Sequence, residues 1–81
     1  MPELWKKKPI PVEVVQFTAE NKDDLRRFIG NKGYIEDDDI VIGTLEGVVR
    51  ASLGSYVVKG NEGEFWPVKE SIFEKTYERA E

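Results

Sequence analysis

The sequence predicts an α+β fold: a small antiparallel β-meander or partly closed roll of about five strands, packed with one amphipathic helix after the first strand and a short C-terminal helical segment. Three observations lead to this class. The 81 residues suit a single small core. Runs rich in β-branched residues are separated by turn signals about every ten residues. One stretch, Thr18–Ile29, carries apolar residues at helical spacing.

Two regions are predicted, a flexible N-terminal tail over residues 1–8 and one α+β domain over residues 9–81. The tail is polar apart from Leu4 and Trp5 and ends in the lysines Lys6–Lys8. Such termini usually fray, so the lysines are interpreted as solvated, although a run of cations also suits a phosphate backbone or an acidic partner. Trp5 is expected to pack back on the domain or on a neighbouring subunit, because burial of an indole is favourable.

Residues 9–17 predict the first strand, because β-branched residues favour strands and the two prolines suit a strand start or an edge. Side chains alternate between the two faces of a strand. One face then holds Ile10, Val12, Val14 and Gln16, and the other holds Glu13, Val15 and Phe17. Gln16 therefore either ends a buried stretch or is a polar group directed into a pocket.

The stretch Thr18–Ile29 predicts the covering helix, whose apolar face is formed by Leu25, Phe28 and Ile29. Asn21 and Asp24 have the spacing of an imperfect capping box. Gly30 follows as a left-handed C-cap, since glycine tolerates positive φ.

Four consecutive acids, Glu36–Asp39, follow the short segment Tyr34-Ile35. A calcium-binding EF-hand loop spaces its ligands at alternate positions around a glycine, and consecutive acids in a strand connection point in alternating directions. A solvated acidic turn is therefore predicted in place of a calcium site.

The remaining strands are predicted from residue 40 onward, where segments 40–45 and 48–53 flank the hairpin signal Glu46-Gly47. Tyr56–Lys59 and residues 64–68 follow as two more strands joined by a glycine-containing turn. Turn signals at this spacing are typical of an antiparallel meander with short connections.

The C-terminal residues 69–80 predict a short helix or turn. Ser71 and Glu74 have capping-box spacing, and an apolar side is supplied by Ile72, Phe73, Thr76 and Tyr77. Pro67, just before this segment, is expected at a sheet edge or strand end because proline lacks a ladder donor.

The composition excludes several functions. Without Cys there is no disulfide or thiolate chemistry, and without His the commonest general base and transition-metal ligand are missing. A net charge of −4 argues against a dedicated nucleic-acid binder. The apolar runs are far short of the ~20 residues that span a bilayer, and no signal peptide precedes the fold, so a cytoplasmic protein without membrane span, metal or cofactor is expected.

Catalysis has little support in the sequence, and no catalytic residue is predicted. An acid–base pair would need a carboxylate, and Glu64 is the best candidate because it shares a strand face with Trp66. Glu13 is second, and neither has a second acid at a recognisable spacing. A small enzyme that uses Glu64 is therefore the least favoured function.

The sequence gives more support for ligand binding than for catalysis. Six residues are candidates for a ligand site: Gln16, Arg50, Lys59, Glu64, Trp66 and Lys69. Adjacent strands would bring the three cations towards one face or rim for a phosphate, with Trp66 as a stacking surface. Gln16 and Glu64 would form hydrogen bonds to a base or ribose. In the alternative interpretation, Arg50 and Lys59 are exposed cross-strand charges paired with glutamates.

Three late segments, residues 53–60, 63–69 and 72–77, resemble a family of small uncharacterised bacteriophage and prophage proteins. That family has a Pro-Gly-Asp-Tyr-Ile-Ile-Lys-Gly … Gly-Glu-Phe-Tyr-Pro … Phe-Glu-Lys-Thr-Tyr pattern. Residues 8–17 and 44–47 are similar too. This chain has Leu53 and Ser55 where the pattern has Pro and Asp. The resemblance implies a phage accessory protein that acts inside a bacterial host cell.

The function expected from the sequence is therefore non-enzymatic binding by a phage accessory protein, with counter-defence sequestration of a small anionic, nucleotide-like signal as its concrete form. The alternative is a protein–protein interaction module that modulates a bacterial host protein through an exposed sheet face or edge. A small sheet with a residual apolar face commonly dimerises, so a homo-oligomer is expected.

Overall fold

A computed structural model describes residues 2–4 and 11–78, and the elements within these residues confirm the α+β class. Strands β1, β5 and β6 form one antiparallel sheet in the order β1-β5-β6, named sheet A. Strands β2, β3 and β4 form a second, named sheet B, in the order β2-β3-β4. The elements are β1 (Glu13–Gln16), α1 (Lys22–Ile29), the 3-10 turn η1 (Gly30–Lys32), β2 (Gly33–Glu36), β3 (Asp39–Thr44), β4 (Gly47–Ser52), β5 (Tyr56–Lys59), β6 (Phe65–Val68) and α2 (Glu70–Thr76).

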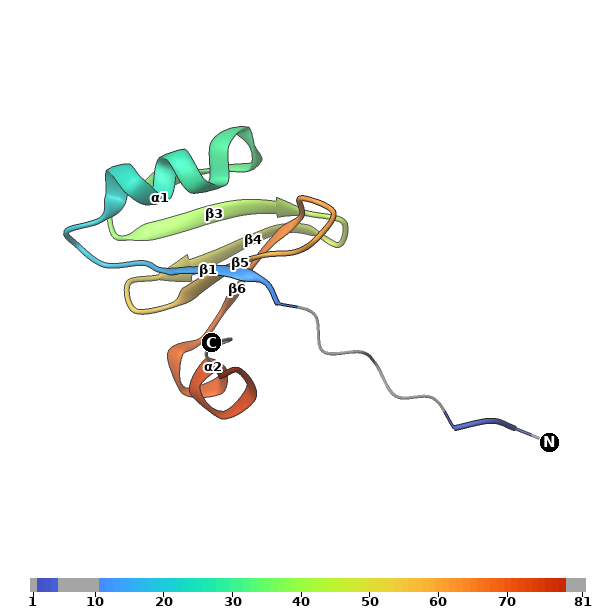
Figure 1. Cartoon of the computed structure of the whole chain (residues 1–81). Coiled ribbons are helices and arrows are strands. Elements are labelled where there is room, and N and C mark those ends of the chain that lie inside the picture. The colour runs from blue at the N-terminus through green and yellow to red at the C-terminus, as the bar shows by residue number, and fades with distance from the viewer. Residues whose placement is uncertain (1, 5–10, 79–81) are drawn as a thin grey trace.

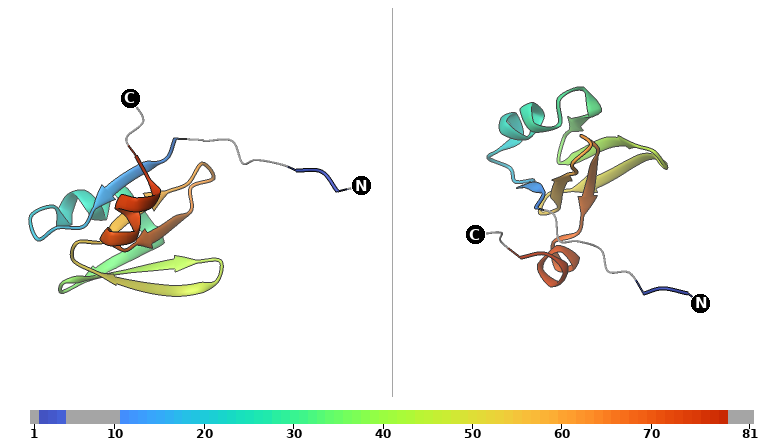
Figure 2. Two further views of the ribbon diagram at one scale, coloured as in Figure 1. Left: turned by 90° about the horizontal axis from the view of Figure 1, so that it is seen from below. Right: turned by 45° about the vertical axis from the view of Figure 1, so that its right-hand side comes forward.

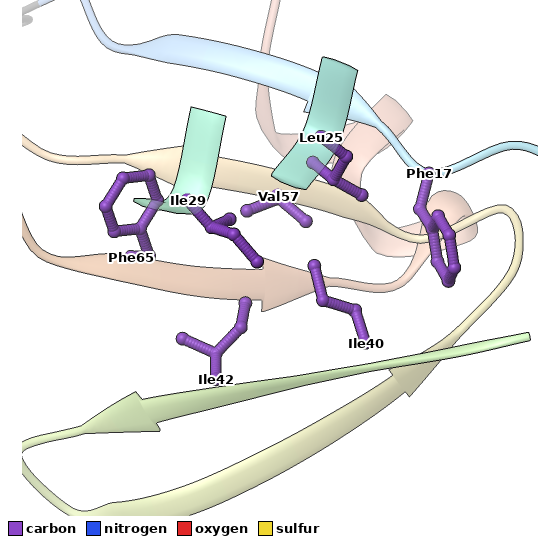
Figure 3. Packing of buried hydrophobic residues seen from close by; sticks show 7 residues of the cluster. All are labelled: Phe17, Leu25, Ile29, Ile40, Ile42, Val57 and Phe65. Carbon is purple, nitrogen blue, oxygen red and sulfur yellow. The ribbon is translucent and has the colours of Figure 1, made fainter. Parts of the chain in front are cut away.

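One hydrophobic core lies between the two sheets and α1. Strand β6 approaches β3 and β4 across the core, and α1 packs beside β2 (Figures 1 and 2). The buried side chains come from α1 and from both sheets, and they point toward one another in Figure 3: Phe17, Leu25, Ile29, Ile40, Ile42, Val57 and Phe65. The strands thus form a partly closed roll that α1 covers.

The strands from residue 39 onward do not form one continuous meander. Strand β4 is hydrogen-bonded to β3, whereas β5 is hydrogen-bonded to β1 and β6. The chain changes sheet at Gly54, which has a φ of 94° and donates its N–H to the Phe17 carbonyl at 2.8 Å. The Phe17 N–H in turn donates to the Ser55 carbonyl at 2.8 Å. The predicted short segment at residues 34–35 is a sixth strand, β2.

Strand β1 directs Val15 and the adjoining Phe17 into the core, while Val14 and Gln16 lie on the outer face of sheet A. The predicted strand began at Pro9, which lies outside the described residues, as do Ile10, Trp5 and Lys6–Lys8. The predicted assignment of residues to the two faces is confirmed for the described part of the strand.

Helix α1 is shorter at its start than predicted, because the residues before Lys22 form a turn. The Asn21 side chain closes that turn: its Oδ1 accepts from the Thr18 N–H at 2.9 Å, and its Nδ2 donates to the Gln16 carbonyl at 2.6 Å. The predicted capping box is therefore wrong, since Asn21 makes no side-chain bond to the helix that it precedes. Gly30 is the C-cap of α1 with a positive φ of 57°, as predicted, but its ψ of −128° lies outside the left-handed helical region.

Replacing Asn21 with alanine is expected to lower the free energy of unfolding by about 1–2 kcal/mol, because the Thr18 N–H and the Gln16 carbonyl both lose a partner. Urea unfolding followed by circular dichroism measures the change. Asn31→Ala, an exposed position in η1, is the matched control and should change stability by less than about 0.5 kcal/mol. Equal losses in the two variants would contradict the role of the Asn21 turn.

Helix α2 lies on the outer face of sheet A and buries none of its residues fully. Its attachment is aromatic: the Phe73 ring stacks on Tyr56 with 3.9 Å between ring centroids, and Tyr77 stacks on Phe73 at 4.7 Å. The predicted capping box of Ser71 is wrong, because the N-cap is Lys69 and no side chain caps the helix. Helix α2 is thus a peripheral element, held mainly by one stack of rings.

Candidate functional site

The six predicted ligand residues lie in three separate places. Lys59, Glu64 and Trp66 lie at or near the β5–β6 hairpin of sheet A, and Arg50 lies on β4 of sheet B. Gln16 lies at the other end of β1, and Lys69 precedes α2. The predicted rim of three cations is therefore not formed.

Arg50 is occupied by two carboxylates of its own sheet. Its Nη2 donates to Glu36 Oε1 at 2.8 Å, and its Nη1 donates to Asp39 Oδ2 at 2.9 Å. The hydrogen bonds that Arg50 donates, first to Glu36 and then to Asp39, raise the pKa of Arg50 above its ordinary value. For Arg50 the alternative interpretation from the sequence, a cross-strand charge with acidic partners, is thus confirmed.

The acidic turn between β2 and β3 is exposed and contacts cations of the same chain. Lys22 Nζ donates to the Asp37 carbonyl at 2.8 Å and forms an ion pair with Asp38 at 3.2 Å, and Asp37 has a φ of 55°. Among residues 2–4 and 11–78, no group of three or more carboxylates is placed to hold a metal ion. Neither helix in the same residues has the length and apolarity to span a bilayer.

Gln16 makes two contacts within the protein. Its Nε2 donates to the Gly54 carbonyl at 3.1 Å and to Glu70 Oε2 at 2.7 Å. The side chain thereby ties β1 to the β4–β5 connection and to the first residue of α2. The structure therefore gives Gln16 the role of a structural link at the end of β1.

The β5–β6 hairpin places Lys59 and Trp66 on opposite faces of sheet A. Lys59 pairs with Phe65 in the register and shares its face, where Lys59 Nζ lies 5.9 Å from the Phe65 ring centroid. Trp66 pairs with Val58 and lies on the outer face. A ligand stacked on Trp66 therefore does not meet the ammonium of Lys59 on the same surface.

Glu64 and Trp66 share the outer face, as predicted, and both side chains fold over Gly60. A Cβ at Gly60 would meet the Glu64 carboxylate and would lie 3.0 Å from Trp66 Cζ3. Gly60 is buried, whereas Glu64 is exposed. This close packing explains why the hairpin needs glycine at position 60. The Trp66 indole covers this glycine and so has a structural role.

The outer face of sheet B carries a different set of side chains, which the sequence patterns did not single out. Tyr34 and Val41 are paired across β2 and β3, and Gly43 and Val48 are paired across β3 and β4. We name these four residues the outer patch. Tyr34 is 55% exposed and Val48 is 75% exposed, while Val41 between their strands is covered.

The outer patch continues into the β3–β4 turn, where Leu45 is fully exposed. An apolar residue inside a tight turn cannot reach the core. The exposure of Leu45 could therefore have been predicted from the sequence. Arg50 borders the patch beside Val41, with its two carboxylate partners. The surface thus combines an apolar centre with a hydrogen-bonded polar border.

Comparisons of the chain with protein-family models, with curated proteins and with solved structures found no significant match. The resemblance to a phage protein family therefore stays a prediction from the sequence patterns.

Proposed function

We propose that this protein is a non-enzymatic binding protein whose outer patch docks another protein. The exposure of Tyr34 and Val48 on the same face of sheet B, together with that of Leu45 in the adjoining turn, carries the proposal, since exposed apolar side chains gain by burial in a complex. Tyrosine is also among the residues that contribute most to protein interfaces.

The border of the outer patch supports a protein partner. Arg50 is fixed by Glu36 and Asp39, so this polar edge is ordered before a partner arrives. Ordered charges at the rim of an interface favour specificity and association rate more than affinity. An apolar centre with a polar rim is the usual composition of a protein–protein interface.

The partner that we propose is a bacterial host protein, following the resemblance to phage proteins. This choice ranks the interaction module above the sequestration of a nucleotide-like signal. A nucleotide needs several cations around its phosphates, and in this fold Arg50 is paired on one sheet while Lys59 and Lys69 lie elsewhere.

The test compares affinity purification from bacterial cells for the natural chain and for the double variant Tyr34→Ala/Val48→Ala, with quantitative mass spectrometry. A defined partner should be recovered with the natural chain and reduced at least about tenfold with the double variant, because two anchors of roughly 1–2 kcal/mol each are lost. The purified partner should then shift the backbone amide NMR signals of β2, β3 and β4.

Ile72→Ala is the matched control, because Ile72 is 53% exposed on α2, away from sheet B. This variant should recover the partner as well as the natural chain does. A partner that the double variant retains in full would contradict the proposal. Light scattering tests whether a second copy of the chain occupies the outer patch. A dimer that is lost in the Tyr34→Ala/Val48→Ala variant would assign the patch to self-association instead.

A further inference from the structure

A groove opens at the end of sheet A where the start of β1 meets the β5–β6 hairpin. It has a volume of about 470 Å³, within the range of sites that hold small molecules. Its lining comes from two segments that are far apart in the sequence: Pro11, Val12, Glu13, Lys59, Gly60, Asn61 and Gly63. The groove is separate from the outer patch, which lies on sheet B.

Two opposite charges line this groove and leave each other unpaired. Glu13 and Lys59 are partners in the β1–β5 register, so both extend from the same face of sheet A. Neither takes part in an ion pair within the described residues, whereas Lys22, Arg26, Arg27 and Arg50 all do. Lys59 is only partly exposed, and its ammonium rests near the Phe65 ring. A positive and a negative group are therefore both available to a molecule in the groove.

The hairpin loop gives this groove a fixed wall. The Gly60 N–H donates to the Glu64 carbonyl at 2.8 Å, and the Gly63 N–H donates to the Gly60 carbonyl at 3.1 Å. Gly63 has no side chain, and the space beside it is open, whereas the Glu64 and Trp66 side chains cover Gly60. The exposed Asn61 side chain forms no hydrogen bond within the described residues and adds an amide that can donate and accept.

We propose that the groove binds a small zwitterion, such as a free amino acid or a short peptide, with its carboxylate on Lys59 and its ammonium on Glu13. Both ligand charges then gain a charged hydrogen bond, which a neutral ligand cannot do. A polyphosphate fits less well, because Glu13 repels its negative charge and, of the groove-lining residues that the structure describes, Lys59 alone is a cation.

The experiment titrates the isotope-labelled full chain with L-alanyl-L-alanine at millimolar concentrations and follows its amide NMR signals. Gly60, Asn61 and Gly63 are expected to shift in a saturable way. The N-acetylated dipeptide and the dipeptide C-terminal amide each lack one charge, so their Kd should be about tenfold higher. Inorganic phosphate and AMP are titrated in parallel as anions without an ammonium group.

Lys59→Gln and Glu13→Gln should each raise the Kd about tenfold, because each removes one of the two charge contacts. Lys69→Gln makes the same change of charge outside the groove and should leave the Kd unchanged. Dispersed amide signals show that each variant is folded. The absence of saturable shifts at the loop, equal affinity for the N-acetylated form, or tighter binding of phosphate or AMP would each overturn the proposal.

Discussion

Replacing Phe17 with alanine is expected to lower the free energy of unfolding by about 4 kcal/mol. The Phe17 side chain is completely buried and packs where β1, α1 and β3 meet (Figure 3). Its removal loses the transfer free energy of the ring and leaves a cavity that the strands cannot fill. A domain of this length has a total stability of roughly 4–12 kcal/mol, so the variant should be close to unfolding. Urea unfolding measures the loss directly.

Phe73→Ala is the matched control for this prediction, because it makes the same substitution outside the core. Phe73 is half-buried on α2 and stacks on Tyr56 and Tyr77. The loss should be about 1 kcal/mol, as expected for stacked rings that stay partly exposed. A loss for Phe73→Ala as large as that for Phe17→Ala would contradict the description of α2 as a peripheral element.

The parts of the fold that depend on residues close together in the sequence could be predicted. The apolar face of α1 and the β3–β4 hairpin lie where periodicity and turn residues placed them. The division into two sheets could not be predicted, because β5 pairs with β1 across a long separation in sequence. The bonds that join Gly54 and Ser55 to Phe17 leave no local pattern in the chain.

The candidate ligand site was the least predictable part for the same reason. Residue order indicates which face of a strand each side chain occupies, but only the register shows which neighbours share that face. Lys59 faces Glu13 and Phe65, whereas Trp66 faces Val58. The same two-residue period did place Glu64 with Trp66 correctly, since both belong to one short segment of chain.

Ion pairs between different elements of the fold also limited the prediction of the ligand site. Four consecutive acids suggested a solvated turn, and the turn is indeed exposed. Its acids are also the partners of Arg50 and Lys22, which come from other elements. A lysine or arginine that the sequence offers to a ligand is therefore available to that ligand only when no acidic side chain of the same fold pairs with it. Within the described residues Lys59 meets that condition, whereas Arg50 and Lys22 do not.

Gly33→Ala is expected to lower the free energy of unfolding by about 3 kcal/mol. Gly33 begins β2 with a fully extended backbone, at φ −172° and ψ −171°. A Cβ there would collide with the Val41 carbonyl oxygen and would lie 3.1 Å from the Ile42 Cα. Both are backbone atoms of β3, the central strand of sheet B, so relief would require displacing a strand that is hydrogen-bonded on both sides.

Gly43→Ala isolates this steric cause, because Gly43 lies on the same sheet but has space for a side chain. Its nearest neighbour to an added Cβ is the Lys32 carbonyl oxygen at 3.7 Å, an ordinary contact. Alanine in place of glycine also reduces the conformational freedom of the unfolded chain, so Gly43→Ala should leave stability unchanged or raise it by up to about 1 kcal/mol. Urea unfolding of the two variants distinguishes the explanations: a similar loss in both would mean that sheet B responds to any added side chain, whereas a loss confined to Gly33→Ala places the cause in the contact with β3.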